Sequence, residues 1–321
     1  MIKDVLKLLE GKSAKAFKIA RERLSTESMK RGHLRKALWY YENNWNDVLH
    51  PGIIAIACEA VGGSEEESML MQVPMLFFTA AADVHDDIID ESQLKNGRPT
   101  IFGKFGKDIA LLAGDRMLFK GMEALYISGK RIAGDKMDRI VKAIDNAFVE
   151  VGEAHSSEIR FKEELNLDPK EYFCMLEKKS AILEAHTRIG ALVGSGTEKE
   201  VEILTDYGRT LGTLMTLRDE FIDLFEPQEL SDRLKNGCLP LPMIYAFKDP
   251  AVKKSVMTIL KNPKISKKDV DMIVDFAFQD QNVKRLKKEM IDLSNVAFEL
   301  VADLGRNEHL KLIVDTVLQN L

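Results

Sequence analysis

Long hydrophobic runs are missing from this sequence. Charged residues interrupt its apolar stretches, and none approaches the ~18 consecutive apolar residues that a membrane-spanning helix requires. The first residues, MIKDVLKLLEGK, are interrupted in the same way. We therefore expect a cytoplasmic protein without a transmembrane segment.

Cysteine is also scarce, and no sign of charge dominates. The 3 cysteines, Cys58, Cys174 and Cys238, are far apart and odd in number, which argues against a disulfide framework or a zinc site. Their apolar or helical surroundings predict buried side chains. The net charge of -5 provides no general field that favours nucleic acid, so any anion that the protein binds must be held locally.

Helical periodicity dominates the chain, and no window alternates as a strand does. The pattern predicts an all-α fold. One long helix is expected from Ser64, a plausible N-cap in SEEE, to Asp90, and the loop KNGRPT at 95–100 follows it. Further helices are predicted near 107–128, 133–160, 168–194, 198–225, 250–261, 266–280, 282–304 and 306–320. No flexible linker divides them, so we expect a single helical domain, residues 1–321, around a deep cavity.

Two acidic clusters of similar shape stand out, and the first is DVHDDIID. On a helix Asp86 and Asp90 lie about 40° apart, with Asp87 beside them, so three carboxylates point at one spot. Like charges this close repel one another unless a cation neutralises them. A single such triplet is more often a solvated helix face than a binding site.

The second cluster, in LRDEFIDLF, repeats this spacing with Asp219, Glu220 and Asp223. Each cluster directly follows an apolar helical stripe, and this repetition favours a binding site over a solvated face. Magnesium prefers oxygen ligands and usually takes one or two carboxylates together with phosphate oxygens. Two such clusters facing each other would grip a diphosphate between them.

Several blocks, in order from about residue 45 onward, resemble the trans-isoprenyl diphosphate synthase (polyprenyl synthetase) family. DDIIDES with KNGRPT resembles the first aspartate-rich motif and its loop, and KFGKDIALLAGDRML at 104–118 resembles the segment that follows. EKKSAILEAHTRIGAL at 177–192 resembles the family's lysine-bearing helix, and GTLMTLRDEFID at 212–223 its second aspartate-rich motif.

The resemblance implies a prenyltransferase with the isoprenoid synthase type of helical bundle. The six acidic residues would hold three Mg2+ ions on the diphosphate of an allylic substrate, whose departure leaves an allylic cation. Asp86, Asp87, Asp90, Lys179 and Asp219 would be the catalytic residues. Substrate-binding positions would include Lys95, Lys179, Ser180, Thr216 and, because the alignment after the second motif is ambiguous, Lys235 as a candidate. A homodimer is also implied.

The sequence departs from the family where isopentenyl diphosphate, the second substrate, is expected to bind. The basic motif before ACEAVGG reads WNDVLHP here, which puts Asp47, Val48 and His50 at three basic positions. Thr79 replaces a histidine and Asn96 an arginine. Each lost charge-assisted contact forfeits roughly 1.5–3 kcal/mol. This second site therefore looks dismantled, unless Arg98 or the basic residues Lys30, Arg31 and Arg35 compensate.

Product length in this family depends on side-chain bulk below the first motif. Ala81 and Ala82 leave room there, and Phe78 either floors the cavity one to two turns lower or is an ordinary core residue. If Phe78 floors the cavity, we expect a substrate or product of fifteen to twenty-five carbons.

Three functions are therefore open. The first is elongation, in which an allylic diphosphate condenses with isopentenyl diphosphate to give a short- or medium-chain polyprenyl diphosphate. The second ionises the allylic diphosphate without isopentenyl diphosphate, as a cyclase-like enzyme, a transferase to another acceptor or a hydrolase. The third is a non-catalytic partner subunit of an active homologue, against which the retained acidic clusters count.

Overall fold

The protein is built almost entirely from α-helices, as the sequence predicts. The computed structural model describes residues 2–24, 32–95, 97–162, 167–225, 230, 233, 239–259, 266–279 and 281–318. Within these residues the strands are β1 (Leu94–Lys95) and β2 (Arg98–Pro99), a short antiparallel pair in the loop after the first acidic cluster. None of the helices in the described ranges is both long and apolar enough to cross a membrane.

The chain folds into two compact units. The first contains residues 1–141, 186–201 and 304–306, and the second contains 142–185, 202–303 and 307–321. The first acidic cluster belongs to the first unit and the second cluster to the second unit. The sequence-based expectation that both units belong to a single domain stays a prediction.

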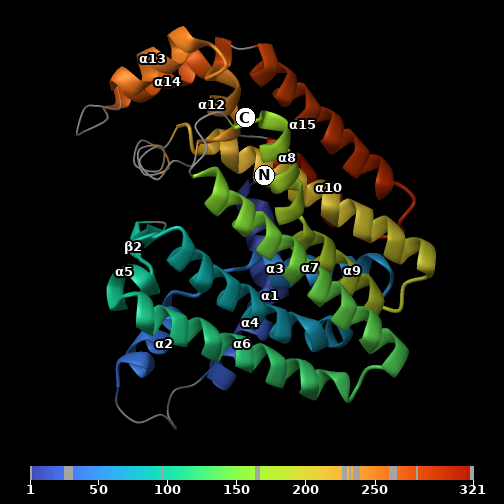
Figure 1. The fold of residues 1–321 in the computed structure, drawn as a ribbon. Helices are drawn as coiled ribbons and strands as arrows, with labels where there is room; N and C mark the ends of the chain where they lie inside the picture. The colour runs from blue at the N-terminus through green and yellow to red at the C-terminus, as the bar shows by residue number, and fades with distance from the viewer. Residues whose placement is uncertain are drawn as a thin grey trace. The chain divides into compact units, whose positions relative to one another are not determined.

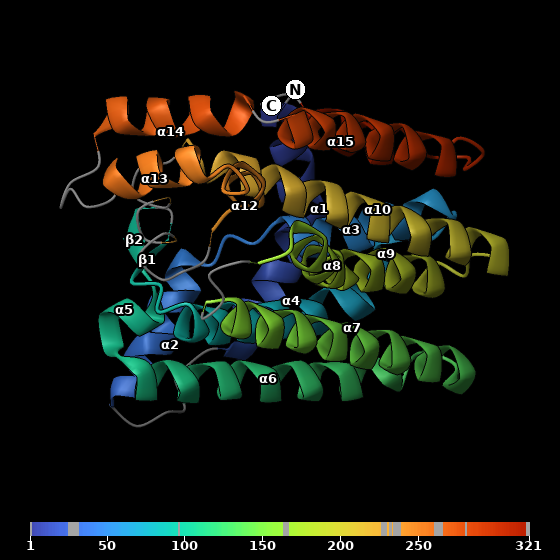
Figure 2. The ribbon, with the colours of Figure 1, turned by 45° about the horizontal axis from the view of Figure 1, so that its top comes forward.

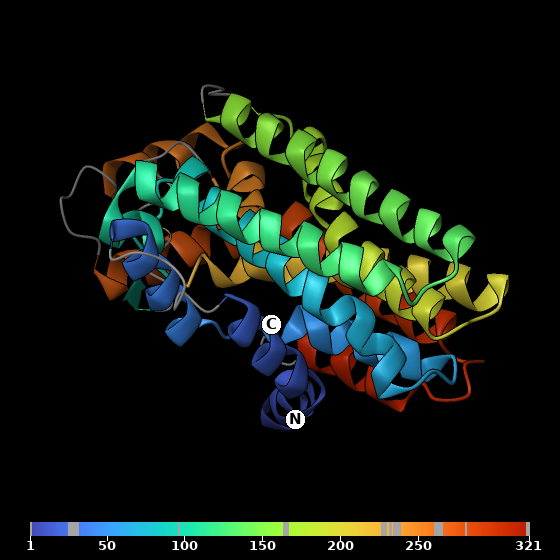
Figure 3. The same cartoon turned by 90° about the horizontal axis from the view of Figure 1, so that it is seen from below.

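The first unit holds the N-terminal helices and the start of a long helix that continues into the second unit (Figure 1). Its helices are α1 (Ile2–Leu24), α2 (His33–Asn44), α3 (Leu49–Ala60), α4 (Glu65–Ile89), α5 (Ile101–Phe105), α6 (Lys107–Gly129) and the start of α7 (Gly134–Phe161). Seen from below, α4 and α6 run side by side and α2 lies along α5 (Figure 3). Trp45 lies at the centre of an aromatic cluster, with ring centroids 5.6 Å from both Phe17 and Phe77.

Helix α4 begins where the sequence predicts. The side chain of Ser64 accepts a hydrogen bond from the Glu67 N–H, and the Ser64 N–H donates to the Glu67 carboxylate at 2.8 Å. This reciprocal capping satisfies two backbone donors that the first turn would otherwise leave unpaired. The helix ends at Ile89, so Asp86 and Asp87 occupy its last turn and Asp90 is its C-cap.

Two glycines of α6 receive aromatic rings from α4. A Cβ atom on Gly114 would lie 2.3 Å from Nε2 of His85, and one on Gly121 would lie 2.7 Å from the ring of Phe78. His85 and Phe78 are seven residues apart on α4, and Gly114 and Gly121 are seven residues apart on α6. The order is reversed, because the later residue on α4 contacts the earlier glycine on α6. The glycines therefore allow α4 and α6 to approach closely and in one register.

The second unit is organised around α10 (Glu198–Ile222) and the C-terminal helices. Its remaining helices are α8 (Pro169–Lys179), α9 (Ala181–Val193, shared with the first unit), α12 (Leu241–Ala246), α13 (Pro250–Ile259), α14 (Lys267–Gln279), α15 (Gln281–Leu300) and α16 (Glu308–Leu318). The buried Tyr207 of α10 donates to the carbonyl oxygen of Leu310 at 2.8 Å. Helices α13 and α14 lie side by side over a small apolar core that includes Leu224, Met243 and Ile273 (Figure 2).

Two sequence predictions need correction. The expected helix over 168–194 is broken at Ser180, which ends α8. A Cβ atom on Gly212 would lie 2.7 Å from that of Ser180, so the break accompanies a close approach of α10. Cys58 is buried as expected, but Cys174 is exposed, because it lies on the solvent-facing side of α8. Cys238 lies outside the described residues.

Candidate active site

Both acidic clusters lie at the C-terminal end of a helix, which is an unfavourable place for negative charge. Asp86, Asp87 and Asp90 end α4, while α10 ends at Ile222 between the members of the second cluster. The carbonyl end of a helix carries a partial negative charge, and each carboxylate there costs about 0.3–1 kcal/mol. Such an arrangement favours sites that a cation occupies.

The first cluster contains a fourth carboxylate that the sequence analysis missed. Asp83 lies one turn before Asp86 and Asp87 and forms an ion pair with Lys95 of β1. The Lys95 ammonium is also 4.0 Å from a carboxylate oxygen of Asp87. Lys95 therefore already neutralises part of this cluster. The i, i+3, i+4 spacing of DVHDD was the signal that could have identified Asp83.

Asp87 is the most buried carboxylate of this cluster, with 6% of the residue exposed. Burial and the neighbouring carboxylates Asp83, Asp86 and Asp90 raise the pKa of Asp87 to about 7, although Lys95 acts in the opposite direction. Its negative charge is thus poorly compensated in the protein alone. A divalent cation would favour the ionised form.

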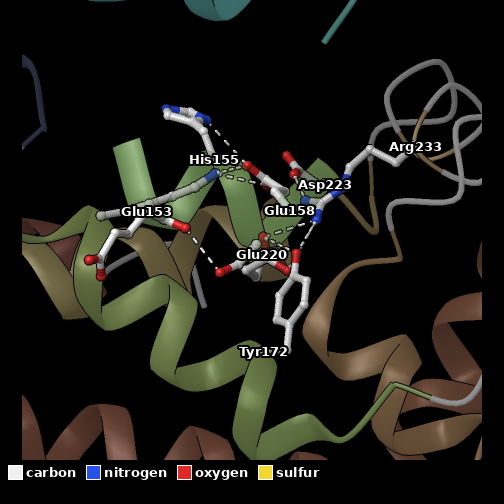
Figure 4. Close-up of polar contacts among 9 residues, drawn as sticks. Glu153, His155, Glu158, Tyr172, Glu220, Asp223 and Arg233 are labelled. Carbon is white, nitrogen blue, oxygen red and sulfur yellow. Dashed lines mark hydrogen bonds and ion pairs between the residues drawn. The ribbon is translucent and has the colours of Figure 1, made fainter. Parts of the chain in front are cut away.

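The second cluster pairs with an arginine that sequence reasoning also missed. The guanidinium of Arg233 forms an ion pair with Asp223, and its Nη2 lies 3.0 Å from a Glu220 oxygen (Figure 4). Glu220 accepts two further hydrogen bonds, from the Leu241 N–H at 2.6 Å and from the Tyr172 hydroxyl at 3.3 Å. Glu220 is therefore fixed within the fold.

Asp219 is the most accessible acid of the second cluster, with a side chain 64% exposed. Desolvation is the largest influence on this carboxyl group, and together with Asp223 and Glu220 it raises the pKa of Asp219 to about 6, against the effect of Arg218. Thr216 lies one turn earlier on α10, and its hydroxyl donates to the Gly212 carbonyl at 2.9 Å. Lys235 lies outside the described residues.

Lys179 is held by a carboxylate rather than exposed to solvent. Its ammonium lies 2.8 Å from Glu158 of α7. His155 lies 3.5 Å from the same carboxylate, and Figure 4 labels both of these residues. Burial by itself would raise the pKa of Glu158, but His155 and Lys179 outweigh it and hold the pKa at about 2. Ser180 is buried against Gly212 and accepts a hydrogen bond from Thr213 at 3.2 Å, which favours a packing role.

The residues at the expected second-substrate positions bind one another. Both oxygens of Asp47 lie 2.8 Å from Nδ1 of His50, and the Thr79 hydroxyl donates to Asp47 at 3.2 Å. Burial alone would lower the pKa of His50, but Asp47 outweighs it and raises that pKa. Val48 packs against the apolar core of the first unit. The result is an internally neutralised ion pair.

Of the basic side chains named in the sequence analysis as replacements, Arg98 and Arg35 lie within the described residues. Arg98 donates to the side chain of Asn44 at 3.0 Å, and Arg35 is partly buried on α2. Lys30, Arg31 and Asn96 lie outside the described residues. The contacts of Arg98 direct it toward α2.

The side chains that would line a hydrocarbon site below the first cluster are small or packed. Ala81 is 1% exposed and Ala82 is partly buried, whereas Phe78 is 5% exposed against Gly121. Gly121 therefore supports the ring of Phe78, a contribution that the sequence did not reveal.

The donor chemistry of the clusters suits magnesium. Within the described part of the chain, no three His, Cys, Asp or Glu side chains are grouped closely enough to hold a metal by themselves. Magnesium does not need such a cage, because it usually takes one or two carboxylates, waters and phosphate oxygens. Crowded carboxylates at helix C-termini, two of them with raised pKa values, fit an ion that arrives with a diphosphate.

The chain belongs to the polyprenyl synthetase family, whose model matches residues 32–277. The resemblance drawn from the motifs is thereby confirmed. The chain is 28% identical over 182 residues to a short chain isoprenyl diphosphate synthase of Methanothermobacter thermautotrophicus, covering 56% of this chain and 55% of that protein. It is 25% identical over 264 residues to a geranylgeranyl diphosphate synthase of Sulfolobus acidocaldarius, covering 81% and 75% respectively.

The fold is that of solved synthases. The crystal structure of a geranylgeranyl pyrophosphate synthetase from Pyrococcus horikoshii superposes with a TM-score of 0.88 at 22% identity, covering 100% of this chain and 99% of that one. In sequence, however, the match spans only about half the length of several curated relatives. The particular reaction and substrates therefore need an argument from this chain's own residues.

Proposed function

We propose that the protein is a magnesium-dependent prenyltransferase that ionises an allylic diphosphate and condenses it with isopentenyl diphosphate to a short- or medium-chain polyprenyl diphosphate. The observation that carries this proposal is the pair of acidic clusters, each at the C-terminal end of a helix and each next to a basic side chain. Bound magnesium would supply neutralisation of the charge that develops on the departing diphosphate.

The roles of the chain's residues follow from their placement. Asp86, Asp87 and Asp90 would hold magnesium at the first cluster, and Asp219, Glu220 and Asp223 would hold it at the second. Because Glu220 already accepts several hydrogen bonds, Asp219 and Asp223 are the better candidates for direct ligands. Lys95 and Lys179 would exchange their present carboxylate partners for diphosphate oxygens. Phe78, Ala81 and Ala82 would exclude water from the hydrocarbon.

A second candidate function drops isopentenyl diphosphate, and the Asp47–His50 pair favours it. A second diphosphate at this position would meet a carboxylate that is bonded to both His50 and Thr79. The acid clusters do not depend on this pair. The protein would then ionise an allylic diphosphate and cyclise it, transfer it to another acceptor or hydrolyse it.

One incubation series separates the two functions. The purified protein is given magnesium and labelled allylic diphosphates of ten, fifteen and twenty carbons, with and without isopentenyl diphosphate. Longer diphosphates that form only with isopentenyl diphosphate support elongation. Magnesium-dependent release of diphosphate without it supports the second function. An absence of turnover in both mixtures would contradict both functions for the isolated chain.

Matched variants test the acidic clusters. Asp86→Asn and Asp223→Asn should each lower turnover by about a hundredfold or more, because each removes a charge expected to face the leaving group. Asp108→Asn, at an exposed position in the first turn of α6, should leave turnover unchanged. If Asp86→Asn and Asp223→Asn turn over substrate as fast as Asp108→Asn does, the acidic clusters do not take part in the reaction and the proposal is wrong.

We also propose that a second copy of the chain covers one face of α6, in a cytoplasmic homodimer. Leu112, Phe119 and Tyr126 are spaced seven residues apart and exposed, the last two by 66% and 69%. Such a stripe is typical of a helix packed against a partner helix. Phe119→Glu should give a monomer by light scattering, whereas Met257→Glu on α13 should not. A monomeric wild-type protein would exclude this dimer.

A further inference from the structure

Arg233 supplies a positive charge to two carboxylates of the second acidic cluster, Glu220 and Asp223. Its side chain is 13% exposed, and its guanidinium contacts Asp223 and both oxygens of Glu220, the latter at 3.0 and 3.3 Å. The Tyr172 hydroxyl lies 2.8 Å from the same nitrogen, Nη2 (Figure 4). This is a paired, largely desolvated guanidinium with several fixed partners.

The two carboxylates differ in what they would keep if the arginine left. Glu220 would retain the Leu241 N–H and the Tyr172 hydroxyl, both of which belong to the surrounding fold. Asp223 follows the last residue of α10, its side chain is 24% exposed, and its charge is directly balanced by the guanidinium. Departure of Arg233 would therefore release Asp223 as a ligand while Glu220 stays in place.

A guanidinium has donors only, so it cannot share a carboxylate oxygen with a metal ion without bringing two positive charges together. We propose that Arg233 is the resident counter-ion of the second cluster, and that a divalent cation binds Asp223 by displacing it. Asp223 thus alternates between an arginine-bound and a metal-bound state. This inference rests on the proposed function, in which the cluster takes a divalent cation.

Lys95 contacts the first cluster in a similar way but more loosely. Its side chain is 49% exposed, and its contact with Asp87 is 4.0 Å long. An exposed ammonium exchanges partners at little cost, whereas Arg233 bridges Asp223 and Glu220 through charge-assisted, largely desolvated contacts. Exchange of a counter-ion should therefore limit metal binding at the second cluster much more than at the first.

Manganese binding to the full-length protein tests this inference without relying on turnover. Mn2+ is titrated by calorimetry and by electron paramagnetic resonance, and the site at the second cluster is the one that disappears in Asp223→Asn. In Arg233→Gln this site should bind Mn2+ between about ten and about a hundred times more tightly, the equivalent of about one charge-assisted contact. Arg285→Gln on α15, whose side chain is 77% exposed, controls for the lost positive charge.

A second measurement uses the wild-type protein, because removal of one partner from a buried ion pair can prevent folding. Modification by phenylglyoxal, followed by mass spectrometry, should be slow at Arg233 without metal and severalfold faster with saturating Mn2+. Arg285 should react at the same rate in both conditions.

The outcomes separate this inference from the proposed function. Unchanged Mn2+ affinity in folded Arg233→Gln, or unchanged reactivity of Arg233 on metal addition, overturns the exchange while leaving the metal-binding role of Asp223 intact. If Asp223→Asn removes no Mn2+ site, the second cluster does not bind a divalent cation, and the proposed function fails together with the exchange.

Discussion

Replacing Asp87 by asparagine should stabilise the metal-free protein at pH 8 and change it little at pH 4. The pKa of Asp87 is raised from 3.8 to about 7 in the folded protein, chiefly by burial, and the side chain is 8% exposed. The folded state therefore holds this proton more tightly than the unfolded state does. Between about pH 4 and pH 7 the wild-type protein loses stability as the pH rises, and the loss persists above pH 7.

The difference between the two pKa values sets the magnitude. It corresponds to roughly 4 kcal/mol of free energy of unfolding at pH 8, as an upper figure. Asparagine has nearly the same shape and no charge, so Asp87→Asn should remove most of this penalty. The assay is urea denaturation followed by circular dichroism at several pH values between 4 and 8, with a chelator present.

Two comparisons make this test specific. Asp108→Asn removes an exposed carboxylate in the first turn of α6 and should change the free energy of unfolding by no more than about 1 kcal/mol at either pH. Added magnesium should stabilise the wild-type protein more than Asp87→Asn at pH 8, because binding to the folded state adds stability. If the difference between Asp87→Asn and wild type is the same at pH 4 and pH 8, burial of an uncompensated charge at Asp87 is the wrong explanation.

Three further substitutions test the fold and the hydrocarbon site. Tyr207→Phe should cost about 1–3 kcal/mol in denaturation, because it leaves the buried Leu310 carbonyl without its donor, whereas Tyr126→Phe at an exposed position should cost nothing measurable. Gly190→Ala would place a Cβ atom 2.5 Å from the Ile54 carbonyl oxygen and should lower the melting temperature, while Gly11→Ala, with open space around it, should not. Phe78→Ala should lengthen the products seen by chromatography, and an unchanged product distribution would assign Phe78 to the core alone.

The elements predicted well from the sequence are those specified by local signals. Ser64 and Glu67 lie within one turn of each other, and the apolar stripe of α4 needs no distant contact to be recognised. The aspartates were found for the same reason. In contrast, the break at Ser180 depends on the close approach of Gly212, which is 32 positions later in the sequence and cannot be read from helical periodicity. No helix was assigned before residue 64, so α1, α2 and α3 were missed.

The site residues that sequence reasoning missed are those defined by their partners. Arg233 is an ordinary basic residue until the fold places it against Glu220 and Asp223. Glu158 likewise becomes notable only through its contact with Lys179. The sequence shows which residues carry a charge, but tertiary packing determines which ion pairs they form.

Gly114 and Gly121 of α6 fix the position of α4 at two points along its length. His85 rests on Gly114 beside the carboxylates, and Phe78 rests on Gly121 two turns away. Eight residues of helix separate Asp86 from Phe78, a rise of about 12 Å. Under the proposed function, a different side chain at position 78 would change where the hydrocarbon site ends without moving the acids, because both ends of this helix segment are fixed against α6. In the proposed reaction, product length and ionisation would then depend on different residues, and each could change independently during evolution.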